Sequence, residues 1–354
     1  MQKSIFKKIS VVILSFSLGI ASVAIAAPKP SSEITGAGSS FIYPVMMEWI
    51  KQYLQAEHVT INYQSIGSGG GISQLKSGTI EFAASDEPLK TPELNQLHWT
   101  QFPMITGGIV MAINVKGIKS NQLVLDGNTV ADIYLGKIKY WDNKEIAALN
   151  PGLKLPHQNI ITIHRSDGSG TTFNFTYFLS QVNPTWKSQV GFSTAVKWEA
   201  TGIGAKGNAG VAAQIAHFPG AIGYVEFAYA KQNNLSITKM KNKAGKVVEA
   251  TPATFTAAAE NGSWTASNNF YELLSDKPGD QSWPMVATTF ILMPSNGKNL
   301  SAADRQAILK FFTWCYENGD KAAASLDYVN IPKSVYQKII ASWSNTTGSA
   351  KAQA

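Results

Sequence analysis

The chain of 354 residues is poor in several features that would place it in a specialised class. Its one cysteine, Cys315, cannot form an internal disulfide, so a large apolar core must stabilise the fold. Charged residues make up only 15% of the chain and hydrophobic residues make up 44%, which excludes a disordered protein. The length suggests about two domains of typical size.

Signatures of common enzymes are also missing. There is no Gly-x-Ser-x-Gly nucleophile elbow, no His-x-His or His-Glu-x-x-His, and no Gly-Lys pair followed by Ser or Thr as in a P-loop. No His or Asn motif accompanies Cys315, which we interpret as a small buried side chain rather than a nucleophile. We therefore expect no catalytic residue, no metal and no cofactor, with a secreted phosphatase or hydrolase as the rival interpretation.

A long apolar run occurs only near the N-terminus. Three lysines precede an apolar run over 11–20, and Ala24-Ile25-Ala26 has the small-x-small pattern of a cleavage site. The run is short for a membrane span and contains two serines, so we interpret 1–26 as a removed signal peptide rather than an anchor. The mature chain would begin near Ala27 in the periplasm with a net charge of about +4. That charge is too weak to indicate nucleic-acid binding, and we expect a monomer.

Strand-like runs, Gly/Ser loops and helical patterns alternate along the chain. Three such units contain loops at 36–40, 67–71 and 166–170. Alternating strands and helices predict an α/β fold with a mostly parallel sheet, whose ligands bind at the carboxyl ends of strands. Further strands are predicted at 80–84, 108–115, 221–227 and 288–293, and further helices at 129–136, 209–217, 302–318 and 334–343.

Two apolar, strand-like segments near 107–114 and 287–293 are interpreted as crossings between two lobes. Lobe I is predicted to comprise residues 27–110 and 286–354. Lobe II is predicted to comprise residues 111–285. These two names are kept below for these ranges.

The three loops indicate an anion site. A helix N-terminus leaves about four N–H groups unpaired and carries a partial positive charge. Glycine lets the backbone approach a ligand closely, and Ser or Thr hydroxyls add donors. A single loop of this kind is typical of ordinary caps and turns, but three at one edge of a sheet favour a binding site.

Arginine usage supports this interpretation. Of the two arginines in the chain, Arg165 stands beside the third loop and Arg305 stands in a polar helical stretch. Arg offers a planar fork that can grip a tetrahedral oxyanion, and Asp167 could hold that fork in place. The alternative is a surface Arg–Asp pair of little energetic weight. Arg305 is expected to be a solvated surface residue.

Asp86, at the end of a strand-like run, is unexpected in an anion site. An ionised carboxylate only accepts hydrogen bonds, so it would favour an anion that still carries an O–H. Phosphate near neutral pH does and sulfate does not, which makes Asp86 a selectivity device. The alternatives are that Asp86 caps the following helix, or that the ligand is another oxyanion such as sulfate or molybdate.

Long sequence strings give the chain a family resemblance. Between about Ile34 and Trp343 it resembles the phosphate-binding periplasmic protein of the phosphate-specific ABC transporter. The strings that carry the resemblance are TGAGSSF at 35–41, IGSGGG at 66–71, FAASDEP at 82–88, LVLDGNTVADIYLGKIKYW at 123–141, RSDGSGT at 165–171, GAKGNAG at 204–210 and PGAIGYVEFAY at 219–229.

The resemblance implies a fold, a function and partners. The fold is the type II periplasmic-binding-protein fold, with two α/β lobes joined by a two-stranded hinge and the ligand cleft between them. The function is high-affinity binding of inorganic phosphate outside the cytoplasmic membrane and delivery to an ABC-type phosphate importer. The implied partners are therefore phosphate and the membrane permease subunits of that importer, with no nucleic acid.

The resemblance also implies a set of phosphate-binding residues. Lobe I would supply Ser40, the backbone of Phe41, Ser68 and Asp86, and lobe II would supply Arg165, Asp167, Ser169, Gly170 and Thr171. The counterpart of Asp86 accepts the phosphate proton, and that of Asp167 supports the arginine. Ser40 stands where the family often has Thr, and Gly69 stands where Ser is common. A hydroxyl donor is kept at the first position and the backbone donors at the second.

Overall fold

A computed structural model of the chain describes residues 33–295 and 300–348. The predicted signal peptide, residues 1–26, lies outside the described residues and stays a prediction. Within those two described ranges, no helix is long and apolar enough to cross a membrane.

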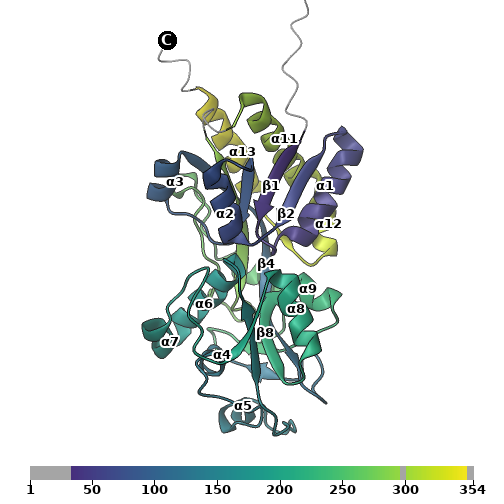
Figure 1. Ribbon diagram of the computed structural model, residues 1–354, viewed down its shortest axis with the longest axis vertical. Helices are drawn as coiled ribbons and strands as arrows, with labels where there is room; N and C mark the ends of the chain where they lie inside the picture. The colour runs from purple at the N-terminus through teal and green to yellow at the C-terminus, as the bar shows by residue number, and fades with distance from the viewer. Residues whose placement is uncertain (1–32, 296–299, 349–354) are drawn as a thin grey trace, which may run out of the picture.

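A mixed sheet runs through the whole molecule in the order β2-β1-β3-β12-β4-β8-β6-β7 (Figure 1). Its strands are β1 (Ile34–Gly38), β2 (Ile61–Ser65), β3 (Phe82–Ser85), β4 (Trp99–Asn114), β6 (Ile161–Arg165), β7 (Gly202–Ala205), β8 (Ala221–Glu226) and β12 (Val286–Pro294). Strand β1 is parallel to β2 and β3, and β6 is parallel to β7 and β8. The central strands β4 and β12 are antiparallel to their neighbours. The predicted mostly parallel sheet therefore holds only for the outer strands.

Strand β4 belongs to both halves of this sheet. It pairs with β12 from Trp99 to Gly108 and with β8 from Ile109 to Asn114. The sequence predicted only its second half, because nearly the whole strand is buried and so lacks the alternation of a half-buried strand. Pro103 lies where the register with β12 shifts, a place where a strand tolerates proline. The predicted lobe boundaries themselves stay a prediction.

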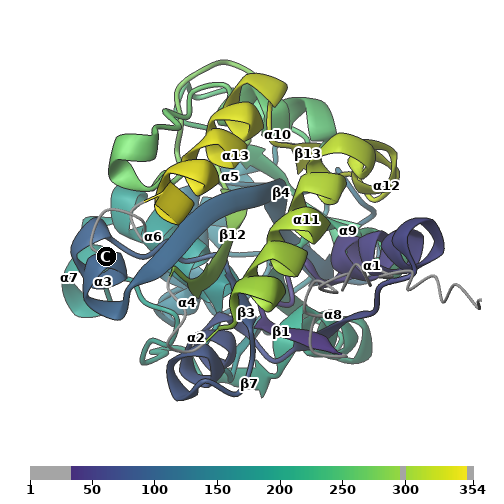
Figure 2. The same ribbon diagram turned by 90° about the horizontal axis from the view of Figure 1, so that it is seen from above.

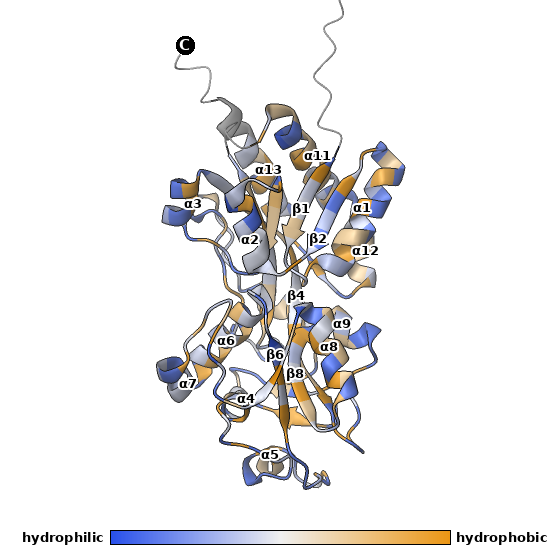
Figure 3. Ribbon diagram, in the orientation of Figure 1, coloured by the Kyte–Doolittle hydropathy of each residue, from blue (hydrophilic) through white to orange (hydrophobic). Residues whose placement is uncertain are grey.

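Helices surround each half of the sheet, and the apolar strands lie between them (Figures 1, 2 and 3). The upper half in Figure 1 contains α1 (Tyr43–Glu57), α2 (Ser68–Ser77), α3 (Thr91–Leu97), α11 (Ala302–Asn318), α12 (Asp320–Ser325) and α13 (Lys333–Gly348). Lobe II contains α4 (Gly127–Tyr134), α5 (Lys144–Leu149), α6 (Gly170–Val182), α7 (Pro184–Gln189), α8 (Gly207–His217), α9 (Phe227–Gln232) and α10 (Pro252–Ala259).

Short elements complete the fold. Strands β5 (Val124–Leu125), β10 (Lys239–Lys241) and β11 (Val247–Val248) form a second small sheet. Strands β9 (Ser236–Ile237) and β13 (Val329–Asn330) pair with β4, and η1 (Ala266–Asn268) is a single 3-10 turn.

Two of the predicted loops are shorter than expected. Gly36 to Gly38 continue β1, and Gly69 to Gly71 belong to the first turn of α2. Glycine has no strong preference for loop, strand or helix, so the surrounding structure decides which of these it joins. The helix α11, by contrast, has the predicted bounds.

Two residues of α11 test the burial predictions. Cys315 is buried, as predicted. Arg305 was predicted to be solvated, and this is wrong, because only 9% of the residue is exposed and burial lowers its pKa. Arg305 lies one turn before the buried Ile308, so its long aliphatic stem is covered on the inner face of the helix.

Candidate anion-binding site

Three buried tyrosines hold the segment that joins β1 to α1. Their hydroxyls donate to three consecutive backbone carbonyls, Tyr63 to Ser39 at 2.7 Å, Tyr229 to Ser40 at 2.7 Å and Tyr328 to Phe41 at 2.6 Å. Burial raises the pKa of Tyr63 and Tyr328 well above the usual value, so both stay protonated donors. The carbonyl oxygens of this segment, which would repel an anion, are thereby occupied.

Asp86 follows β3 and is almost completely buried. Its Oδ1 accepts hydrogen bonds from the Ser39 hydroxyl at 2.6 Å and from the Thr289 hydroxyl at 2.7 Å. Burial raises the pKa of Asp86 to about 6, although these two hydroxyls and the charge of Arg165 act to lower it. The next helix, α3, has Lys90 as its N-cap, so Asp86 does not cap it. Asp86 is a buried acceptor that ionises close to neutral pH.

Arg165, at the end of β6, is paired with Asp167 as predicted. Its Nε donates to Asp167 Oδ1 at 2.7 Å, and its Nη2 donates to Asp167 Oδ2. Burial acts to raise the pKa of Asp167, but the hydrogen bonds and charge of Arg165, with the N–H of Gly207, lower it below the usual value. Only 2% of the Arg165 side chain is exposed, which excludes the alternative of a surface pair. Asp167 occupies the Nε edge, which leaves the end with Nη1 and Nη2 to face a ligand.

The N-terminus of α6 lies beside this pair. Ser169 caps the helix, because its hydroxyl accepts from the N–H of Thr172 at 3.0 Å. The backbone N–H of Gly170, the first residue of α6, donates to the Ser68 hydroxyl of lobe I at 3.1 Å. A side chain at Gly170 would place its Cβ 2.5 Å from Ser68 Oγ and 2.6 Å from Asp86 Cβ. Glycine is therefore required here for the two lobes to meet.

A second glycine contact brings the other predicted loops together. The N–H of Gly69 donates across the junction to the carbonyl of Gly168 at 2.9 Å. Gly67 has φ +85°, and a Cβ there would lie 2.3 Å from Asp167 Oδ2. The three Gly/Ser loops predicted from the sequence therefore converge at one place between the lobes.

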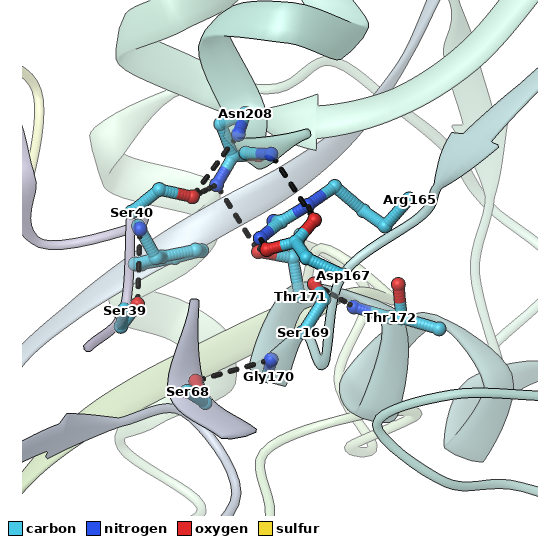
Figure 4. A network of polar contacts seen from close by, with 12 residues as sticks. Ser39, Ser40, Ser68, Arg165, Asp167, Ser169, Gly170, Thr171, Thr172 and Asn208 are labelled. Carbon is cyan, nitrogen blue, oxygen red and sulfur yellow. Dashed lines mark hydrogen bonds and ion pairs between the residues drawn. The ribbon is translucent and has the colours of Figure 1, made fainter. Parts of the chain in front are cut away.

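Three hydroxyl groups at this junction each accept two N–H hydrogen bonds. Figure 4 shows the two from Asn208 to Ser40 and the one from Gly170 to Ser68. Ser40 Oγ accepts from the backbone N and the Nδ2 of Asn208 at 3.0 and 2.9 Å. Ser68 Oγ accepts from the backbone N of Asp86 and of Gly170 at 3.2 and 3.1 Å. Thr171 Oγ1 accepts from Arg165 Nη1 at 3.4 Å and from Asn208 Nδ2 at 3.1 Å. A hydroxyl has one donor and two acceptor positions. With both acceptor positions filled, each hydroxyl is left as a donor.

The predicted backbone donor Phe41 lies in the same cluster. Its N–H donates to Ser39 Oγ at 2.9 Å. Its role as a ligand donor stays a prediction. The other eight predicted residues are also brought together at the junction, and their ligand roles stay predictions too; they are Ser40, Ser68, Asp86, Arg165, Asp167, Ser169, Gly170 and Thr171.

Sequence reasoning missed several members of this cluster. Asn208, in the first turn of α8, contacts both Ser40 and Thr171, while Ser39 and Thr289 contact Asp86. The string GAKGNAG contained a signal for Asn208, because it is a fourth Gly-rich loop that joins a strand, β7, to a helix. The sequence contained no signal for Thr289, because this residue lies in a buried strand 203 residues from Asp86.

Metal ligands of the usual kind are not grouped in the part of the chain that the structure describes. No cluster of three or more His, Cys, Asp or Glu residues there could hold a metal ion.

Comparisons with known proteins give one consistent result. Residues 24–318 match the model of the PBP superfamily domain. Two relatives called phosphate-binding protein PstS are similar over most of the chain. That of Xylella fastidiosa (strain Temecula1) is 46% identical over 335 residues, or 93% of this chain and 91% of the relative. That of Pasteurella multocida is 47% identical over 310 residues, or 88% of this chain and 89% of the relative.

A solved structure is similar in fold. It is that of PfluDING, a high-affinity periplasmic phosphate-binding protein bound with phosphate. Its TM-score is 0.69 at 19% identity, and the match covers 88% of this chain and 93% of that one.

Proposed function

The chain belongs to the PBP superfamily and, within it, to the PstS phosphate-binding proteins, and from this membership we propose that it binds inorganic phosphate and delivers it to an ABC-type phosphate importer. Its fold is the type II periplasmic-binding-protein fold. The ligand would lie between the lobes, at the junction where the loops converge.

The observation that carries the proposal is the polarity of the junction. The hydroxyls of Ser40, Ser68 and Thr171 are left as donors, and the end of the Arg165 guanidinium adds charged donors. Such a shell suits a tetrahedral anion, whose oxygens accept from many directions. Arg165 is neutralised in part by Asp167, so the anion is held by many dispersed donors without a metal.

The single acceptor explains why the anion would be phosphate. Both hydroxyls that bind the Asp86 side chain donate to Oδ1. Within the described residues, Asp86 Oδ2 therefore remains as the oxygen that can accept from a ligand. A buried carboxylate beside an anion costs free energy unless the anion donates a proton to it. Phosphate can do so near neutral pH. Sulfate cannot, which disfavours another oxyanion as the ligand.

Each lobe supplies an incomplete half of this shell. Lobe I would give Ser40, Phe41, Ser68 and Asp86, and lobe II would give Arg165, Asp167, Ser169, Gly170 and Thr171. A ligand that contacts both halves favours the closed arrangement through contacts made only there. The closed form would present the surface that the permease subunits of the importer recognise. We place this activity in the periplasm, in a monomer exported by the predicted signal peptide.

Calorimetry of the mature protein tests the proposal directly. Titration with phosphate, sulfate and arsenate should show tight binding of phosphate and arsenate, which both carry a proton, and much weaker binding of sulfate at neutral pH. Absence of phosphate binding would overturn the proposal. A parallel assay with a phosphomonoester tests the rival enzyme interpretation, and turnover above that of an Arg165→Ala variant would support it.

A further inference from the structure

The Asn208 side chain contacts the hydroxyl groups of predicted ligand residues in both lobes. It belongs to the first turn of α8 in lobe II and is completely buried. Its backbone N and its Nδ2 both donate to the Ser40 hydroxyl of lobe I, at 3.0 and 2.9 Å. The same Nδ2 donates to the Thr171 hydroxyl of lobe II at 3.1 Å. Figure 4 shows Asn208 between these two hydroxyls.

The orientation of the Asn208 amide is fixed from behind. Its Oδ1 accepts the backbone N–H of Glu226 at 3.0 Å, at the end of β8. A backbone N–H can only donate, so the oxygen must face Glu226 and the NH₂ group must face the hydroxyls. Glu226 in turn caps α9, which carries the Tyr229 that binds the Ser40 carbonyl. One corner of lobe II therefore presents two donors to the Ser40 hydroxyl and one to its carbonyl.

We propose that Asn208 is a positioning residue, which turns the hydroxyl protons of Ser40 and Thr171 toward the bound anion and does so only when the lobes are closed. This inference rests on the proposed phosphate function. By filling acceptor positions on both oxygens, Asn208 leaves each hydroxyl one way to bond, as a donor. Because Ser40 belongs to lobe I, the contact is lost when the lobes separate, and the Ser40 hydroxyl is then free to rotate. Closure of the lobes and the orientation of the hydroxyl protons toward the anion therefore occur together.

The neutral amide achieves this without adding charge. A lysine in its place would raise the affinity for any anion, sulfate included, whereas an amide only selects the direction of two existing hydroxyls. Ser40 depends on this more than a threonine would, since serine lacks the methyl group that restricts side-chain rotation.

A double-mutant cycle on the mature full-length chain tests the inference. Asn208→Ala, Asn208→Asp, Ser40→Ala and the two combinations with Ser40→Ala are titrated with inorganic phosphate by calorimetry. We expect Asn208→Ala to weaken binding about tenfold, as for loss of one or two hydrogen bonds. Asn208→Asp should be worse, because it accepts from the hydroxyls and turns their protons away from the anion. Both losses should shrink at least about threefold when Ser40 is already alanine, because coupled residues are not additive.

A purely structural role predicts a different order. Aspartate keeps the shape of asparagine and an oxygen for Glu226, so it would then be milder than alanine, and the losses would be the same in both Ser40 backgrounds. Either result overturns the inference. If wild type binds phosphate but the cycle shows no coupling, only this inference fails. If wild type binds no phosphate, the proposed function fails first.

Matched controls separate binding from folding. Asn242 is another buried asparagine of lobe II, whose side chain donates to the carbonyls of Gly279, Asp280 and Ser282. Asn242→Ala should lower the unfolding temperature without changing phosphate affinity. Asn208→Ser, smaller but still polar, replaces Asn208→Ala in the cycle if the alanine variant does not fold, with the same expected coupling.

Discussion

Lobe I brings the Asp86 carboxyl group to the junction and lobe II brings the Arg165 guanidinium group, and the two are held in opposite ways. Asp86 of lobe I is bound by two neutral hydroxyls, and burial raises its pKa to about 6. Arg165 of lobe II is bound by the carboxylate of Asp167, whose pKa is lowered because the hydrogen bonds and charge of Arg165 outweigh burial. Lobe II thus presents a fixed ion pair, whereas lobe I presents a group that can change its protonation.

The difference assigns different tasks to the two lobes. A permanent, buried guanidinium attracts any anion and gains most from being already oriented. An acceptor that must be ionised distinguishes anions with a proton from anions without one. We infer that lobe II supplies most of the affinity and lobe I most of the selectivity. Three changes would break or sharpen this contrast.

The largest effect is expected from Arg165→Ala. The change removes charged donors and leaves Asp167 without its partner beside the anion. We expect phosphate affinity to fall by about 3 kcal/mol, or roughly 100-fold, as measured by calorimetry. Arg165→Lys should recover only part of the loss, because an ammonium lacks the planar fork.

The other arginine of the chain is the matched control. Arg305 is also buried, but it lies in α11 of lobe I. Arg305→Ala should alter thermal unfolding and leave phosphate affinity as in wild type. Equal losses of affinity for the two variants would contradict the role of Arg165.

Asp86→Asn should change selectivity more than affinity. An amide can donate to an oxyanion without a proton, so the ratio of phosphate to sulfate affinity should fall at least about tenfold. The pH dependence follows from the pKa of about 6. Below that pH the Asp86 carboxyl becomes protonated and can donate, so wild-type sulfate binding should strengthen as pH falls from 8 to 5. The variant should lack this dependence on pH in the same calorimetric titration.

Glu87 provides the control for this titration. Burial raises the pKa of Glu87 to about 6 as well, but none of the hydrogen bonds at the junction involves its carboxylate. Glu87→Gln should therefore keep the wild-type change of sulfate affinity with pH. If it abolished that change, the titrating group would be Glu87 and the selectivity role of Asp86 would be lost.

The smallest effect is expected at the surface, where an ion pair joins the lobes. Lys231 Nζ of α9 lies 2.5 Å from Asp327 Oδ2 of lobe I, and 53% of the lysine side chain is exposed. Exposed pairs contribute little, so Lys231→Ala should weaken phosphate binding less than about fivefold, and only at low salt. Calorimetry at two salt concentrations measures this.

A pair of similar exposure within lobe II serves for comparison. Lys137 and Asp132 lie 2.9 Å apart, with 47% and 23% of their side chains exposed. Lys137→Ala should leave affinity unchanged at both salt concentrations, since closure does not form this pair. A loss at Lys231 that persists at high salt would indicate a direct structural role instead.

Much of the junction was predictable because its parts are local in the sequence. Each Gly/Ser loop between a strand and a helix is a continuous segment, and so is the Arg165–Asp167 pair. The rarity of arginine and the position of Asp86 after a strand were also visible in the sequence. The burial of Arg305 was not, because a polar helical stretch gives no sign of what covers it.

By itself, then, the sequence determined which donors and which acceptor are available, since residue type and local pattern fix that chemistry. Only the tertiary structure decided which way each hydroxyl points. That depends on partners far along the chain, such as Asn208 for Ser40, 168 residues apart, and Thr289 for Asp86. Hydrogen bonds between such distant residues leave no periodic or local signal, because they form only when strands and loops from both lobes meet.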